Sequence, residues 1–140
     1  MTGSQRLALF IAAALAVMAA LGFASGHDGL GATLRLNTDT AAVQAPFALA
    51  GFVAARMGRR MSDLFLVAIG LLLVADAFAG ATRGMFYLSF ASLRGTVEPL
   101  ARPARYFAVL PHAVLGVIAL VAGLRSANAA AAQRRDLPPG

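Results

Sequence analysis

The sequence predicts an all-α fold, an integral membrane bundle of four helices, and three observations support this prediction. First, 59% of the 140 residues are apolar and only 13% are charged, whereas soluble domains are about half apolar and about a quarter charged. Second, the apolar residues gather in four runs, each long enough to cross a bilayer as a helix. Third, these runs are rich in Ala and Leu, which favour helix, and lack the strict alternation of barrel strands. The composition excludes an ordinary soluble enzyme and a disordered chain.

The predicted spans cover about residues 7–24, 41–57, 64–81 and 106–124. The connection Gly58–Ser62 is so short that the spans on either side of it must be antiparallel neighbours. The next connection opens with the apolar stretch Met85–Phe90, which we expect to lie in the membrane interface or to extend the third helix. Pro99 and Pro103 are expected to stop helix formation there, and residues 126–140 are expected to form a flexible cytoplasmic tail.

The first span has a second interpretation as a signal peptide. Arg6 is followed by an apolar stretch and then by small residues around Ala24 and Ser25, which is typical of a cleaved leader. The stretch is long for a leader, and an internal repeat described below requires this helix. Residues 1–24 are therefore open to both interpretations.

All 12 basic residues are Arg, and the net charge is +6. A basic chain often binds nucleic acid, but these arginines lie at the ends of apolar runs and form no basic face larger than the group from Arg56 to Arg60. The lipid bilayer, and no nucleic acid, is the predicted partner. One side of the membrane would hold Arg6, Arg56, Arg59, Arg60, Arg125, Arg134 and Arg135, and the other side Arg35, Arg83, Arg94, Arg102 and Arg105. This bias predicts that both termini are cytoplasmic.

The second and fourth spans align with each other without a gap. Residues 46–54 fall on residues 111–119, so that Pro46 pairs with Pro111 and Gly51 with Gly116. The first and third spans pair more loosely, residues 4–22 on residues 62–80. If this is a repeat, the fold consists of two tandem helical hairpins that cross the membrane in the same sense. The alternative is chance similarity between helices rich in Ala and Gly.

The aligned residues have a predicted role in packing. Helices in lipid associate where small residues allow their backbones to approach closely, so Gly51 and Gly116 are expected at helix contacts, as is an alanine stripe that includes Ala12. Pro46 and Pro111 each remove a backbone donor. Each proline is predicted either to kink its helix and open a small polar gap or to be tolerated without consequence.

Asp76 is the most informative residue because an acid deep in a span is costly and usually faces the bundle interior. Counted from the ends of their spans, Asp76 and His112 lie at similar depth, so their side chains can meet. Arg83 lies two turns further along the same helix, and Gln44 on the second span can complete the group. These four residues form the candidate intramembrane polar cluster, either as protonatable groups or as a structural contact between two helices.

Other site chemistry is not predicted. There are no cysteines, and His27 with Asp28 offers too few ligands for a metal site. Haem ligation by two histidines would need a second buried His besides His112, and no nucleophile or phosphate-binding motif is present. The sequence therefore predicts no catalytic residues, no metal and no cofactor.

Three features carry a resemblance to a known family: the four spans, the Arg83-Gly84 pair after the third span, and Gly51 and Gly116 at the centres of the second and fourth spans. In these features the chain resembles small bacterial membrane proteins of the DoxX-like kind and related families of unknown function. The resemblance covers residues 5–125. It implies a four-helix bundle in the bacterial inner membrane and no established catalytic activity.

Three functions remain as hypotheses. The leading one is a non-enzymatic accessory or structural subunit, in a homo-oligomer or a larger membrane complex. The first alternative is a small oligomeric transporter or proton-linked carrier that uses Asp76. The second alternative is an oxidoreductase subunit that contacts a quinone or pigment near His112.

Overall fold

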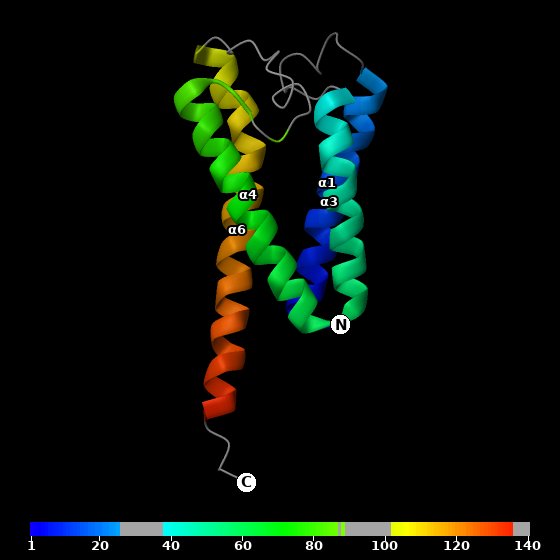
Figure 1. The fold of residues 1–140 in the computed structure, drawn as a ribbon, viewed down its shortest axis with the longest axis vertical. Helices are drawn as coiled ribbons and strands as arrows, with labels where there is room; N and C mark the ends of the chain where they lie inside the picture. Colours follow the sequence, from blue (N-terminus) through cyan, green and yellow to red (C-terminus); the bar gives the residue numbers. More distant parts are fainter. Residues whose placement is uncertain (26–37, 87, 89–101, 136–140) are drawn as a thin grey trace.

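A computed structural model describes residues 1–25, 38–86, 88 and 102–135. These residues contain four α-helices and no strand (Figure 1). The helices are α1 (Gly3–Ser25), α3 (Thr38–Met57), α4 (Arg59–Arg83) and α6 (Arg102–Arg135). All four are long and apolar enough to cross a membrane, which confirms the predicted all-α four-helix fold and indicates a multi-pass membrane protein.

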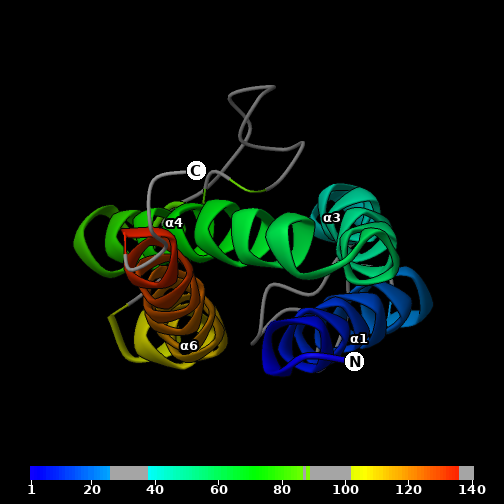
Figure 2. The same ribbon diagram turned by 90° about the horizontal axis from the view of Figure 1, so that it is seen from below.

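The helices form two antiparallel pairs, α1 with α3 and α4 with α6, in agreement with two tandem hairpins (Figure 1). Helix α4 also packs against α1 and α3, so it connects the two hairpins. Viewed along the bundle, α4 crosses from α6 to α3, and α1 and α6 lie on the same side of it (Figure 2). The hairpins meet near the α3–α4 turn, hereafter the turn end of the bundle, and diverge toward the opposite end, hereafter the far end.

The turn between α3 and α4 is shorter than the expected Gly58–Ser62, because Gly58 alone separates the two helices. Its φ of 109° and ψ of −174° lie in a region that is almost exclusive to glycine. Residues 59–62 already belong to α4. Ser62 lies on its first turns, where the hydroxyl donates to the carbonyl oxygens of Ala54 and Gly58 and ties the turn together.

Helix α6 begins and ends outside its predicted span. It starts at Arg102, so Pro103 occupies its first turn instead of stopping it, because a proline there loses no helical hydrogen bond. It ends at Arg135, so the tail expected from residue 126 is helical over its first ten residues. Hydropathy marks only the part of a helix that lies in lipid, whereas Ala-rich polar sequence continues the helix beyond it.

Glycines bring α4 and α6 into close contact. A Cβ added to Gly116 would lie 2.9 Å from the backbone nitrogen of Val74, and one added to Gly70 would lie 2.5 Å from that of Leu120. Gly123 makes a similar contact further along α6. Real Cβ atoms essentially never approach so closely, so the glycines set the distance between the helices, and the predicted packing role of Gly116 is confirmed.

Gly51 has the corresponding position in the first hairpin. A Cβ there would lie 2.8 Å from the Cβ of Ala12 on α1 and 2.6 Å from the Phe65 ring on α4. Gly51 and Ala12 of the alanine stripe, each expected at a helix contact, thus lie against each other. Both glycines aligned by the repeat lie where a helix meets its hairpin partner.

We expect Gly116→Ala to destabilise the protein by about 1–3 kcal/mol, because the added methyl group must push α6 away from α4. Unfolding in mixed micelles with increasing sodium dodecyl sulfate measures this loss. Gly3→Ala is the matched control, since a Cβ at Gly3 meets nothing within 4 Å and alanine favours helix. Equal stability of the Gly116→Ala variant and the wild type would contradict the close packing of α4 and α6.

Candidate functional site

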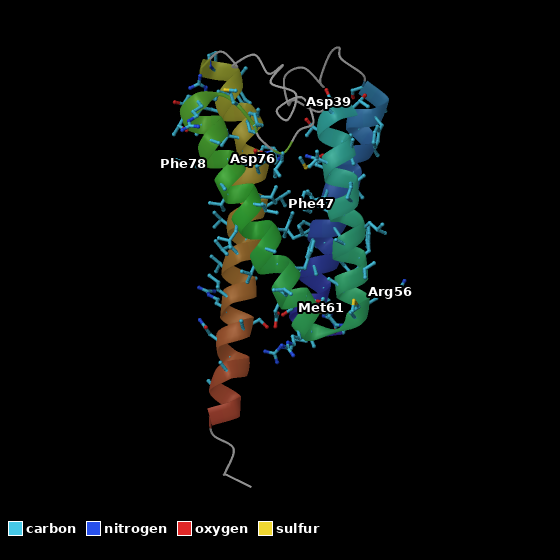
Figure 3. All side chains as sticks on the ribbon, viewed as in Figure 1. Asp39, Phe47, Arg56, Met61, Asp76 and Phe78 are labelled. Atoms are coloured by element: carbon cyan, nitrogen blue, oxygen red, sulfur yellow. The ribbon has the colours of Figure 1, made fainter. Side chains whose placement is uncertain are left out.

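The candidate site is centred on one buried polar pair between α4 and α6. Asp76 Oδ2 lies 3.0 Å from His112 Nδ1, and the side chains are 1% and 8% exposed. Within the described residues, His112 Nδ1 has no other polar partner. Figure 3 shows Asp76 on α4, toward the far end of the bundle. The predicted approach of Asp76 to His112 is therefore confirmed, and the Asp76–His112 pair is the starting point for the site.

The pair follows from the register of the two helices. One turn beyond Asp76, Gly80 faces Val109, and about one turn before it, Leu73 faces Gly116. Asp76 and His112 stand between these contacts, so the same antiparallel register that fits the glycines also brings the acid to the imidazole. Because an unpaired acid is costly in a membrane interior, the pair favours this register over neighbouring ones.

The chain after α4 folds back onto the pair. Gly84 ends the helix with a left-handed conformation, φ 72° and ψ 14°, and its N–H donates to the Gly80 carbonyl oxygen at 2.9 Å, as in the αL cap. The Leu88 N–H then donates to Asp76 Oδ1 at 3.0 Å. Both carboxylate oxygens of Asp76 thus have a polar neighbour in the protein.

Phe86 covers the imidazole of this pair. Its ring lies edge-on to His112, with centroids 5.6 Å apart, and it fits against Gly80, where a Cβ would come within 2.6 Å of the ring. Leu88 packs against the hydrophobic core. The described part of Met85–Phe90 therefore does not extend the third helix, which ends at Arg83, and residues 86 and 88 instead contact Asp76, His112 and Gly80. That this segment lies in the membrane interface stays a prediction.

Arg105 is a residue that the sequence analysis used only for orientation. Its Nη1 donates to the carbonyl oxygens of Ala81 (3.4 Å) and Thr82 (3.3 Å), which lie in the last turn of α4. A Cβ added to Gly84 would lie 2.7 Å from Nη2 of this guanidinium, so the arginine packs directly against the glycine. A cation at the carboxyl end of a helix interacts favourably with the helix dipole, so Arg105 stabilises the end of α4 from which the folded-back segment departs.

The other two predicted members of the cluster differ from the pair. Arg83 is exposed at the end of α4. Gln44 is buried on α3, 3% exposed, and neither atom of its amide has a hydrogen-bond partner in the structure. The structure thus brings Asp76 and His112 together, whereas Arg83 does not share their burial and Gln44 has no hydrogen bond to either of them.

The predicted prolines lie inside continuous helices. Pro46 is within α3 and exposed, and Pro111 is within α6, directly before His112. Neither interrupts its helix, so both the kinked and the tolerated interpretation stay open.

A second polar group lies at the turn end and was not predicted. The hydroxyl of Ser4 donates to that of Ser126 at 2.9 Å, and Arg59 donates to the Ser126 hydroxyl (3.3 Å) and carbonyl oxygen (3.2 Å). Arg59 also lies 3.8 Å from the largely buried Asp63. These contacts join α1, α4 and α6. Serines and arginines at helix ends are common, so the sequence alone gives no reason to group these residues.

A buried apolar layer separates the two polar groups. Between Asp63 and Asp76, the buried face of α4 presents Leu66, Ile69 and Leu73, each at most 2% exposed. They belong to one hydrophobic core with residues of all four helices. Thirteen residues of helix correspond to about 20 Å. The described part of the chain therefore has polar groups near both ends and no polar group on this face between them.

The described residues contain no group of three or more His, Cys, Asp or Glu side chains that could hold a metal ion. His27 and Asp28 lie outside the described residues. Comparison of the chain with protein-family models, curated proteins and solved structures gives no match. The resemblance to DoxX-like proteins thus stays a prediction.

We expect Asp76→Ala to cost about 1–3 kcal/mol of stability, because it leaves the partly buried Leu88 N–H and the buried His112 without an acceptor. A double-mutant cycle with His112→Ala should give a coupling energy of about 0.5–2 kcal/mol, measured by unfolding in mixed micelles. Asp39→Ala is the control. It removes a half-buried acid at the same end of the bundle and should cost about 0.3–1 kcal/mol. A coupling energy of zero would contradict the pairing.

Proposed function

We propose that this multi-pass membrane protein is a non-enzymatic accessory or structural subunit, at work in a homo-oligomer or a larger membrane complex. The observation that carries the proposal is the set of contacts made by the buried acid Asp76. Asp76 contacts His112 and accepts the Leu88 N–H, so both oxygens hold the fold together. A catalytic or transporting acid would instead be expected to face a cavity or a water-filled path.

The apolar layer supports the same function. A proton that moved along α4 from Asp63 to Asp76 would have to pass Leu66, Ile69 and Leu73, which offer no hydrogen-bonding group. Proton relays in membrane proteins consist of chains of ionisable residues. The interior of one chain is therefore better suited to packing than to conduction.

The proposed location is the bacterial inner membrane, with both termini in the cytoplasm. Helix α1 begins and helix α6 ends toward the turn end of the bundle (Figure 1), which also holds exposed Arg6, Arg56, Arg60 and Arg125. Arginine-rich ends face the cytoplasm under the positive-inside rule. This side therefore corresponds to the cytoplasmic side.

Purification in mild detergent from the native membrane tests the proposal. We expect one protein partner to co-purify in a fixed ratio, or the chain to form a stable oligomer that shows no activity of its own. The complex should be weakened by bulky substitutions on an exposed face, such as Val117→Trp on α6, and unaffected by Arg125→Gln. Recovery of a monomer alone, from membranes that contain every native protein, would contradict an accessory role.

A proton-linked carrier is the second candidate, and Gln44 is the observation that favours it. A buried amide with no hydrogen-bond partner in the structure is costly and is expected where a polar ligand or water binds. Since the apolar layer closes the interior of one chain, a path would have to form between chains of an oligomer.

This candidate predicts proton flux into proteoliposomes, reported by an enclosed pH-sensitive dye. Asp76→Asn should reduce the flux at least tenfold while the protein remains folded, whereas Asp39→Asn should leave it unchanged. Wild-type vesicles with the same flux as protein-free vesicles would exclude the carrier and leave the accessory function.

A further inference from the structure

An apolar groove runs along the outside of the first hairpin at the turn end. It has a volume of about 870 Å³, within the range of small-ligand sites. Its walls come from α1 and α3 and include Leu9, Phe52, Val53 and Met57. The buried Ala55 also lines it.

Two polar residues lie in the same groove. Gln5 donates from Nε2 to the Ala55 carbonyl oxygen at 2.9 Å, so its amide is already used to join α1 to α3. Arg56 is exposed and makes no hydrogen bond or ion pair with the described residues. Figure 3 shows it extending outward from α3. The groove therefore combines apolar walls with an exposed guanidinium that has no counter-charge among the described residues.

The order of these residues along α3 matches the order of groups in a lipid. Arg56 lies in the last turn of the helix, where the membrane surface is expected, and Phe52 lies one turn deeper, about 6 Å toward the membrane centre. Val53 and Met57 share this face. A molecule in the groove would thus meet a guanidinium at the water boundary and the apolar side chains of Phe52, Val53 and Leu9 below it.

We propose that this groove binds an anionic phospholipid, with the phosphate at Arg56 and an acyl chain along Phe52 and Val53. A guanidinium matches phosphate oxygens with two parallel hydrogen bonds, and arginines at the cytoplasmic surface attract anionic lipids. The inference does not depend on the accessory function. It requires that α1 and α3 span the membrane with Arg56 at the cytoplasmic surface.

Native mass spectrometry of the delipidated full chain in detergent tests the site, with dioleoyl phosphatidylglycerol or dioleoyl phosphatidylcholine added. We expect one phosphatidylglycerol molecule to be retained, with roughly tenfold preference over phosphatidylcholine, because both lipids offer a phosphate to Arg56 but the choline cation cancels the net negative charge and repels the guanidinium. Arg56→Gln should abolish the preference. Equal retention of the two lipids by the wild type would overturn the proposal.

Two matched controls distinguish a specific lipid site from nonspecific attraction of lipids to the protein surface. Arg60→Gln removes an exposed arginine at the same end that does not line the groove, so it should change the preference less than twofold. Phe52→Ala should lower retention of both lipids, whereas Phe107→Ala, an exposed aromatic on α6, should not. If Arg60→Gln acted like Arg56→Gln, or Phe107→Ala like Phe52→Ala, the groove would not be a specific lipid site.

Discussion

The close approach of α4 and α6 is the constraint on which the rest of the structure depends. Gly70 and Gly116 let each helix touch the backbone of the other, and this contact depends on the register of the two helices. That register places Asp76 opposite His112. The pair then fixes the segment after α4, because Asp76 also accepts the Leu88 N–H and the ring of Phe86 covers His112. The packing of α4 against α6 thus determines where the Asp76–His112 pair lies.

The bundle is organised in layers along its length. Serine hydroxyls and Arg59 join three helices at the turn end, and the Asp76–His112 pair joins two helices toward the far end. Large apolar side chains fill the space between them. In lipid, apolar contact gives little preference for one helix arrangement over another. The polar groups at the two levels therefore favour this arrangement of the helices, whose core is held together mainly by packing.

Much of this could be predicted from the sequence, for identifiable reasons. The spans follow from hydropathy, the glycine contacts from the need for small residues in lipid, and the Asp76–His112 contact from counting depth along two antiparallel helices. The position of Phe86 and the hydrogen bond to Asp76 from the Leu88 backbone could not be predicted. An apolar sequence after a helix fits an interface as well as a core, and a backbone donor has no signature in sequence. Arg105 is similar, because arginines near helix ends are common and only the cap geometry at Gly84 distinguishes this one.

Comparison of the two hairpins of the repeat indicates what the Asp76–His112 pair contributes. The alignment places Phe47 where the second hairpin has His112, and Met18 where it has Asp76, so both equivalents in the first hairpin are apolar. Phe47 packs against the hydrophobic core, and α1 and α3 pack closely with Gly51 at their contact. Close packing of such a hairpin therefore does not require a polar pair, in agreement with the finding that apolar residues often replace buried ion pairs without loss of stability. What the second hairpin gains from Asp76 is an acceptor for the Leu88 N–H, which holds the chain after α4 against the bundle.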